Sequence, residues 1–287
     1  MTPLVPGSPA WPAALDELDA PPPALHLRPP GDGDRLAELL RPPVVAIVGT
    51  RKATAGGAAF ARRLAHDLAR VDACVVSGLA AGIDAAAHAG ALDGGGRTIA
   101  VLGCGVDRDY PRANAGLAAR VAAHGAVLSE YEPGTPPAPW RFPARNRIVA
   151  ALAQAVVVVE ASARSGALIT AALALDLGRD VLAVPGTPWH GGHAGQNGLL
   201  RDGAAPVTSV EDVLVALGLD PAELRRDDPA LGADGARVLA AVRRLPATPE
   251  VLAHRVGLTP AALSAALVEL ELAGAVARER DGTVVSA

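Results

Sequence analysis

Two arginines and an asparagine stand together where the sequence predicts the start of a helix, in Phe142-Pro143-Ala144-Arg145-Asn146-Arg147. An apolar run follows to Val159-Glu160, and the turn Ser165-Gly166 then opens a second helix. Helix N-termini present free backbone N–H groups that stabilise anionic oxygens, and guanidinium groups add bidentate contacts to phosphate. This combination predicts a phosphate-binding site. A solvated helix face is the alternative for the two arginines.

A second candidate phosphate contact is Gly49-Thr50-Arg51, which follows an apolar run. The glycine permits a tight turn, Arg51 can reach across the opening, and Thr54 is a good N-cap for a helix that starts near Ala55. Ordinary turn chemistry after a strand is the alternative. Neither GxGxxG nor GxxxxGK[ST] occurs here, so dinucleotide binding and P-loop hydrolysis lose their usual sequence support.

Aromatic side chains near these positions could stack on nucleic-acid bases. Trp140 and Phe142 flank the predicted helix start, and Tyr110 lies in a separate loop. Single-stranded nucleic acid is commonly held by arginines together with stacking platforms. Aromatic residues make up only 2% of the chain, so stacking is limited to a few bases.

A catalytic set is not evident among the acids and histidines. Asp84 and His88 are four residues apart and would share a helix face, but a helix N-terminal carboxylate beside a packed histidine is the favoured interpretation. Glu130 and Glu160 end predicted strands, where catalytic acids often sit, yet no nucleophile with a matching base accompanies them. We therefore expect no enzymatic activity and no cofactor.

No metal site is expected either. His190 and His193 flank two glycines that should leave their loop flexible, and we expect no carboxylate close to them. A mobile loop over the cleft is the favoured interpretation. Cys74 and Cys104 lie in apolar contexts without CxxC spacing, which is typical of reduced, buried cysteines.

Six short apolar runs alternate with helical patterns and predict the parallel sheet of an α/β fold. Ligands of such folds bind beyond the carboxyl ends of the strands, so the turns there should converge on one cleft. The predicted strands are Val44–Val48, Cys74–Ser77, Thr98–Leu102, Ala126–Ser129, Val156–Glu160 and Val181–Val184.

The chain divides into four predicted segments. Residues 1–43 form a proline-rich arm, packed or loose, with a short helix near Asp32 to Leu40; residues 44–218 form the α/β core; and residues 219–233 suit a linker. Residues 234–287 read as a winged helix-turn-helix, with Thr259 as an N-cap and Asp281-Gly282 as a hairpin turn.

The second helix of that helix-turn-helix, Ala261 to Ala273, is poorly suited to reading DNA. It offers Ser264, Glu269 and Glu271 and has no Arg or Lys. Base and phosphate contacts favour Arg and Lys, so protein contact is favoured over DNA contact for this domain.

Composition limits the class of protein. The net charge is −4 and 50% of residues are hydrophobic, which favours a folded protein whose phosphate site is local and is not a broad basic face. No uninterrupted apolar run reaches the ~18 residues of a membrane span, and no signal peptide is evident. We expect a cytoplasmic protein without membrane contact.

With these residues in hand, the chain resembles the DprA/Smf family of DNA-processing proteins over about residues 11 to 215, and the small final domain also resembles that of many members. The resemblance rests on an ordered series of motifs: Val48-Gly49-Thr50-Arg51, Ser77-Gly78-Leu79, Gly82-Ile83-Asp84 with His88, Leu102-Gly103 with Gly105, Tyr110-Pro111 with Asn114, Ser129-Glu130, Phe142 to Ile148, Ser165-Gly166 with Thr170, Val184-Pro185-Gly186 and Gly195-Gln196-Asn197.

The resemblance implies an extended Rossmann-like fold, a homodimer and single-stranded DNA bound in the cleft. It also implies loading of the RecA recombinase during natural transformation, with displacement of single-strand-binding protein. One departure is Ala81, which stands where the family often has arginine, so one phosphate contact is missing or supplied elsewhere. The DNA- or phosphate-binding residues expected from the motifs and the resemblance are Gly49, Thr50, Arg51, Thr54, Ser77, Gly78, Gly103, Gly105, Tyr110, Asn114, Phe142, Arg145, Asn146, Arg147, Ser165 and Gly166.

Two rival functions stay open. A phosphoribohydrolase-like nucleotide-processing enzyme could use a related scaffold, although the strand end at Ala163 to Thr170 lacks the PGGxGTxxxE signature. A transcription regulator could sense a nucleotide in the core and read duplex DNA through the winged helix, and the acidic second helix weighs against it.

Overall fold

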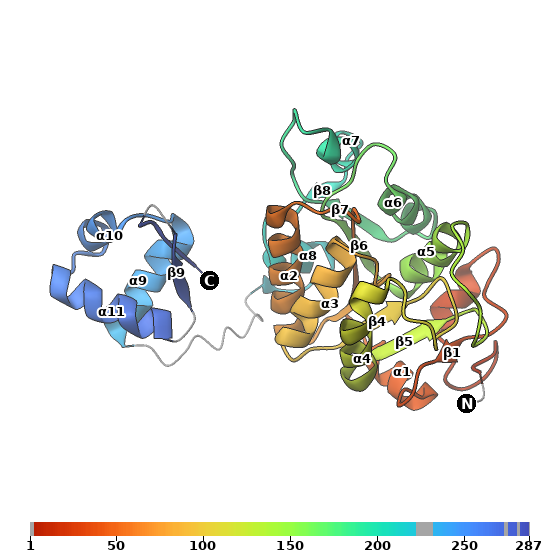
Figure 1. The fold of residues 1–287 in the computed structure, drawn as a ribbon. Coiled ribbons are helices and arrows are strands. Elements are labelled where there is room, and N and C mark those ends of the chain that lie inside the picture. The colour runs from red at the N-terminus through yellow and green to blue at the C-terminus, as the bar shows by residue number, and fades with distance from the viewer. Residues whose placement is uncertain (1–2, 222–231, 273–274, 280–281, 287) are drawn as a thin grey trace. The chain divides into compact units, whose positions relative to one another are not determined.

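The six predicted strands form the centre of an eight-stranded sheet in the computed structural model, which describes residues 3–221, 232–272, 275–279 and 282–286. The strand order is β1-β5-β4-β3-β2-β6-β7-β8, and only β1 runs antiparallel to its neighbour (Figure 1). The strands are β1 (His26–Leu27), β2 (Val44–Val48), β3 (Cys74–Ser77), β4 (Thr98–Val101), β5 (Ala126–Ser129), β6 (Ala155–Val158), β7 (Asp180–Ala183) and β8 (Ala205–Pro206). The predicted α/β fold is confirmed. β6 ends two residues before Glu160, which therefore lies in the loop beyond the strand.

Helices follow the strands, and some of them start at a residue whose side chain caps the helix. Asp32 accepts a hydrogen bond from the Arg35 N–H, and Thr54 accepts one from the Gly57 N–H, as predicted for Thr54. The elements of this unit are η1 (Ala13–Glu17), α1 (Gly33–Leu39), α2 (Ala55–Arg70), α3 (Ile83–Asp93), η2 (Arg112–Asn114), α4 (Ala115–His124), α5 (Arg141–Leu152), α6 (Gly166–Asp176), η3 (Gly191–His193), α7 (Ala194–Arg201) and α8 (Val210–Ala216).

Both faces of the sheet are covered, and β2 shows how one strand serves two cores. Val44, Ala46 and Val48 belong to the cluster that includes α5 and α6, whereas Val45 and Ile47 belong to the cluster that includes α2, α3 and α8. Side chains alternate between faces along a strand, so a continuous apolar run is buried on both sides.

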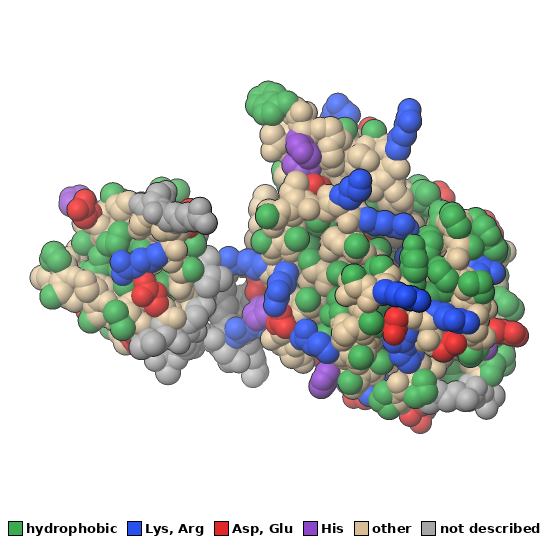
Figure 2. All heavy atoms as spheres, in the orientation of Figure 1, with side chains coloured by type: hydrophobic (Ala, Val, Ile, Leu, Met, Phe, Trp, Pro, Cys, Tyr) green, Lys and Arg blue, Asp and Glu red, His purple; other side chains and the backbone are tan. Residues whose placement is uncertain are grey.

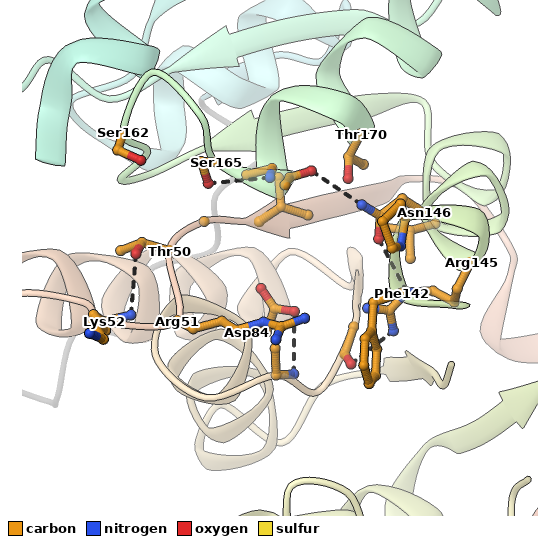
Figure 3. Close-up of a pocket in the computed structure, with 18 of the residues that line it drawn as sticks. Thr50, Arg51, Lys52, Asp84, Phe142, Arg145, Asn146, Ser162, Ser165 and Thr170 are labelled. Atoms are coloured by element: carbon orange, nitrogen blue, oxygen red, sulfur yellow. Dashed lines mark hydrogen bonds between the residues drawn. The ribbon is translucent and has the colours of Figure 1, made fainter. Parts of the chain in front are cut away.

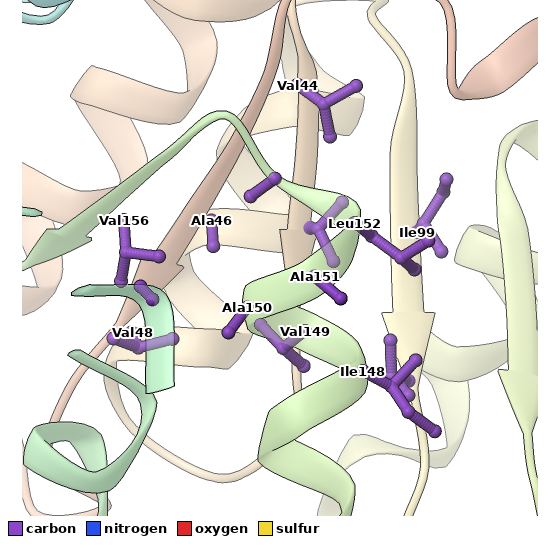
Figure 4. Packing of buried hydrophobic residues seen from close by; sticks show 14 of the residues in the cluster. Val44, Ala46, Val48, Ile99, Ile148, Val149, Ala150, Ala151, Leu152 and Val156 are labelled. Atoms are coloured by element: carbon purple, nitrogen blue, oxygen red, sulfur yellow. The ribbon is translucent and has the colours of Figure 1, made fainter. Parts of the chain in front are cut away.

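The second half of α5 lies in the first of these cores. Ile148 to Leu152 are all buried and lie near Val44, Ala46 and Val156 of the sheet (Figure 4). This packing fixes the helix axis, so the first half of α5 is held at the carboxyl end of the sheet. The side chains from Phe142 to Asn146 are thereby positioned by the core.

The proline-rich arm is packed, which settles the alternative that the sequence leaves open. Trp11, Leu15 and Leu25 are buried in the same core, and His26 pairs with Ser129 of β5. The expected short helix is α1. Buried Arg97 donates hydrogen bonds to the carbonyl oxygens of Leu39, the last residue of α1, and of Arg41, at 3.0 and 2.6 Å, which ties the arm to the start of β4.

By its contacts the chain forms two units, residues 1–225 and 226–287. The second contains α9 (Ala233–Arg244), α10 (Pro249–Val256), α11 (Pro260–Leu272), β9 (Val276–Arg278) and β10 (Val284–Ser286), with the two strands antiparallel. Thr259 accepts a hydrogen bond from the Ala262 N–H, and Gly257 ends α10 at φ 64°. This is the predicted winged helix-turn-helix. Residues 222–231 of the predicted linker, and Asp281 of the predicted turn, lie outside the described residues.

The acids of α11 contact their own domain. Glu271 accepts a hydrogen bond from Arg278 at 2.7 Å, and Glu269 accepts one from the Gly232 N–H at 2.9 Å.

Within the described residues no single helix is long and apolar enough to cross a bilayer; α10 and α11 reach that length only jointly, across a bend of 110°.

Candidate nucleic-acid interface

A pocket of about 520 Å³ opens at the carboxyl ends of β2 and β3 and the N-terminal ends of α5 and α6 (Figure 3). This is the edge where an α/β sheet binds ligands. Three of the strand-end turns predicted to converge, those at Gly49, Gly78 and Ser165, line this pocket, whereas those at Gly103 and Pro185 do not. The pocket is lined by Val48, Gly49, Thr50, Arg51, Lys52, Gly78, Ala80, Asp84, Tyr110, Pro139, Phe142, Pro143, Arg145, Asn146, Val149, Ser162, Ser165, Gly166, Ala167 and Thr170.

Arg51 and Lys52 are the accessible cations of this pocket. Both side chains are exposed, and among the described residues neither of them forms an ion pair. The Arg51 guanidinium carbon lies 4.9 Å from the centroid of the Phe142 ring, a cation–π distance that holds the charge over the opening. These two groups are placed to meet an anion from solvent.

Arg145 lies in the pocket floor and is largely committed to the protein. Its side chain is buried, and Nη1 donates hydrogen bonds to the carbonyl oxygens of Gly78, at 2.8 Å, and Val101. A Cβ at position 78 would overlap this guanidinium, so a residue larger than glycine would displace the Arg145 side chain. Burial lowers the pKa of Arg145, and the Asp84 carboxylate opposes that shift. The Arg145 guanidinium therefore contributes positive electrostatic potential to the pocket floor and is less available than Arg51 for direct contact with a ligand.

Arg147, predicted to contact phosphate together with Arg145, does not line the pocket. Its guanidinium donates to both carboxylate oxygens of Glu130, at 2.8 and 2.7 Å, and to the Ala20 carbonyl at 2.9 Å. The Glu130 hydrogen bonds raise the pKa of Arg147. The physical reason is helical geometry: residues two apart on a helix do not share a face.

Asn146 and Ser165 join the two helix N-termini that face the pocket. The Asn146 amide donates to the Gly166 carbonyl at 3.2 Å and accepts from Arg145 Nε at 3.3 Å. The Ser165 hydroxyl caps α6 by accepting from the Ala167 N–H. The partial positive charge at a helix N-terminus favours an anion in front of α6.

One acid, Asp84, lies among these groups. Burial raises the pKa of Asp84, whereas Arg145 lowers it, and the Ala80 N–H donates to the carboxylate at 3.3 Å. His88, four residues on, points elsewhere: its Nδ1 lies 2.7 Å from the Thr98 hydroxyl, and burial lowers the pKa of His88 to about 3. The predicted packed histidine is confirmed, and the two do not form a hydrogen-bonded acid/base pair.

Two aromatic rings form one wall. Tyr110 and Phe142 stack with centroids 5.3 Å apart and an interplanar angle of 21°. Trp140 lies outside the lining residues, 63% exposed, with the Arg141 guanidinium 4.8 Å from its ring centroid. Of the three predicted stacking residues, two therefore face the pocket.

Five other predicted residues support the walls without lining them. Thr54 caps α2, the Ser77 hydroxyl donates to the Ile47 carbonyl at 2.6 Å, and the Asn114 amide donates to the Leu79 carbonyl at 2.9 Å. Gly103 lies against the Phe142 ring, and the Gly105 N–H donates to the Thr135 carbonyl. The polar groups described here form hydrogen bonds within the protein.

Four lining residues with polar side chains were not predicted as binding residues: Lys52, Asp84, Ser162 and Thr170. Lys52 directly follows Arg51 and is the only lysine in the chain, and these two features could have identified it as a binding residue from the sequence. Ala81, where the family often has arginine, is exposed and outside the lining, next to Ala80.

The expectation that no carboxylate lies near His190 and His193 is wrong. Glu160 Oε1 lies 3.5 Å from His193 Nε2, and the three side chains place one donor atom each within 4.8 Å of the others. Glu160 lies 30 residues before His190 in the sequence and meets the two histidines only through the fold.

Comparison with known proteins identifies the family. Residues 2–218 match the model of DNA recombination-mediator protein A, and residues 222–282 match the DprA winged helix domain. A putative DNA processing protein DprA of Mycobacterium tuberculosis is 48% identical over 250 residues, which cover 84% of this chain and 64% of that protein. The chain thus spans just under two thirds of that relative.

Two solved structures share the fold. DprA of Streptococcus pneumoniae matches with a TM-score of 0.70 and 42% identity over 75% of this chain and 73% of that one. DNA processing protein A of Helicobacter pylori, whose structure is described for its single-stranded DNA binding mode, matches with a TM-score of 0.66 and 33% identity over 75% and 94%. With its Rossmann-like core and winged helix, the chain belongs to the DNA recombination-mediator protein A family, also named DprA.

Proposed function

We propose that this chain binds single-stranded DNA in the pocket bounded by Arg51, Lys52, Phe142 and Ser165. The observation that carries the proposal is the combination of exposed cations, a stacked aromatic pair and two helix N-termini around one opening. Backbone phosphates would meet Arg51 and Lys52, and one base would stack on the Tyr110–Phe142 wall.

The binding is local and electrostatic. The net charge is −4, and basic side chains are scattered over the visible face of the first unit without forming one continuous surface (Figure 2). A duplex, which keeps its bases stacked inside, gains nothing from the aromatic wall. We therefore expect preference for single strands.

We further propose that the protein is a mediator without enzymatic activity. It would act as a homodimer, load the RecA recombinase onto incoming DNA during natural transformation, and displace single-strand-binding protein. Support comes from the family and from a pocket whose one acid, Asp84, has no hydrogen-bonded base among the described residues.

Salt dependence tests the pocket directly. Each phosphate contact contributes about 0.7 to the log–log salt slope for single strands. In fluorescence anisotropy of a labelled oligonucleotide, Arg51→Met and Lys52→Met should each lower the slope by about that amount. Arg120→Met, which removes an exposed arginine that pairs with Asp93, is the matched control and should leave the slope unchanged. Equal slopes for all four proteins would remove the pocket as the DNA site.

RecA loading needs a separate assay. RecA ATPase activity on DNA coated with single-strand-binding protein should start earlier when the wild-type protein is added than when no protein is added, and the Arg51→Met/Lys52→Met protein should give no such advance.

Incubation with nucleoside monophosphates tests the rival enzyme, because steady release of free base would refute the mediator proposal. Light scattering during gel filtration measures the proposed dimer.

A further inference from the structure

Glu160, His190 and His193 form a cluster of metal-ligand type beside the DNA pocket. Glu160 follows β6, whereas His190 directly precedes η3 and His193 is its last residue, between β7 and α7. Their nearest donor atoms, one from each residue, lie within 4.8 Å of one another. Histidine side chains are visible at the surface near α7 (Figure 2).

The local backbone brings the two imidazoles together. Three residues complete one turn of a 3₁₀ helix, so side chains at i and i+3 lie above one another. The ring centroids of His190 and His193 are accordingly 4.5 Å apart. A Cβ at Gly192 would lie 2.8 Å from His190 Cε1, closer than real Cβ contacts, so glycine permits this approach. Gly192 therefore serves close packing, whereas a Cβ at Gly191 would meet open space.

The Glu160 carboxylate is held with one oxygen free for the histidines. Its Oε2 accepts from the N–H and the hydroxyl of Thr54, at 3.0 and 3.1 Å. Its Oε1 lies 3.5 Å from His193 Nε2, and the side chain is 3% exposed. Second-shell hydrogen bonds of this kind orient a carboxylate ligand toward a metal ion.

We propose that Glu160, His190 and His193 bind one divalent transition-metal ion of the zinc class. Two imidazole nitrogens and one carboxylate oxygen are the donor set that zinc and its neighbours prefer, and two histidines with one glutamate leave a fourth position for water. His190 is exposed, so that position opens to solvent.

Loading the site changes one hydrogen bond. The Thr187 N–H donates to His193 Nδ1 at 2.9 Å, so the neutral ring carries its proton on Nε2, facing Glu160. A metal ion on Nε2 moves that proton to Nδ1 and breaks the bond to Thr187. The loop that carries Trp189, which is 89% exposed, must therefore rearrange when metal binds.

The site is coupled to the segment that carries the pocket cations. The Glu160 carbonyl accepts from the Thr50 N–H at 2.7 Å, while its side chain holds Thr54. Thr50 and Thr54 flank Arg51 and Lys52. A bound ion would join the 187–193 loop to this segment.

The test is metal binding by the full, untagged chain, measured by calorimetry with Zn²⁺ and by Co²⁺ quenching of tryptophan fluorescence. One ion per chain is expected, with quenching because Trp189 adjoins His190. His190→Ala and His193→Ala should each weaken binding at least about tenfold. His124→Ala, an exposed histidine on α4, is the control and should bind like wild type.

Two results would overturn the proposal. One is absence of Zn²⁺ and Co²⁺ binding by the wild type, and the other is undiminished binding by both histidine variants. His190 is exposed, so its variant should fold, and far-ultraviolet circular dichroism checks this. Glu160→Gln keeps the shape of the third ligand while removing its charge, and it should also weaken binding.

Discussion

The Arg147–Glu130 pair gives a sharp distinction between a structural arginine and a phosphate ligand. The two N–H···O distances are 2.8 and 2.7 Å, and the side chains are only 19% and 10% exposed. Removing one partner of a fully buried pair costs about 3–5 kcal/mol, because the remaining charge is left without compensation. The residual exposure reduces this, so we expect Arg147→Met to lower the free energy of unfolding by about 2–3 kcal/mol.

Urea unfolding followed by tryptophan fluorescence measures this loss in the first unit alone. All three tryptophans, Trp11, Trp140 and Trp189, lie within residues 1–225. The double variant Arg147→Met/Glu130→Gln leaves no isolated charge and should recover part of the stability. The salt slope of DNA binding should stay at the wild-type value.

The opposite pattern would refute this assignment. A stability loss below about 0.5 kcal/mol, with a salt slope lowered by about 0.7, would make Arg147 a phosphate ligand and the Glu130 contact unimportant.

Three further outcomes follow from buried groups. Gly90→Ala should cost about 1–3 kcal/mol in urea unfolding, because its Cβ would overlap the Arg62 carbonyl, whereas Gly116→Ala, with open space, should not destabilise. Burial lowers the pKa of His88 from 6.5 to about 3, so only the unfolded state gains its proton as pH falls below 6.5. Between pH 7 and 5 this group removes about 2 kcal/mol of stability, and His88→Met should show a smaller loss over that range. Burial raises the pKa of Cys74 to about 12 and also raises that of Cys104, so a thiol reagent should label them only after unfolding.

The fold was accessible from sequence because its signals are local. Runs such as Val44–Val48 are short, apolar and bounded by proline or glycine, and caps such as Asp32 and Thr54 mark helix starts. The strand end at Glu160 was harder to predict, because the apolar run and two backbone hydrogen bonds to the β2 segment continue past Val158, the last residue of β6.

The site was only partly accessible for a different reason. Arg145 and Arg147 are the same residue type, but about 200° of rotation about the helix axis separates their side chains, and the packing of the helix determines which one faces the pocket. The hydrogen-bond partners of Arg147, Glu130 and Ala20, are distant from it in sequence. The approach of Glu160 to His193 likewise exists only in the folded chain.

The strands at the two edges of the large sheet bear on how copies of this chain can associate. β1 and β8 have two residues each; Pro29 and Pro30 follow the first closely, and Pro206, within the second, has no N–H to donate. Exposed edges with rows of free backbone groups recruit further strands and lead to aggregation. Neither edge of this sheet offers such a row, so the addition of a strand from a second copy is disfavoured, and we expect any self-association of this unit to use helix or loop surfaces.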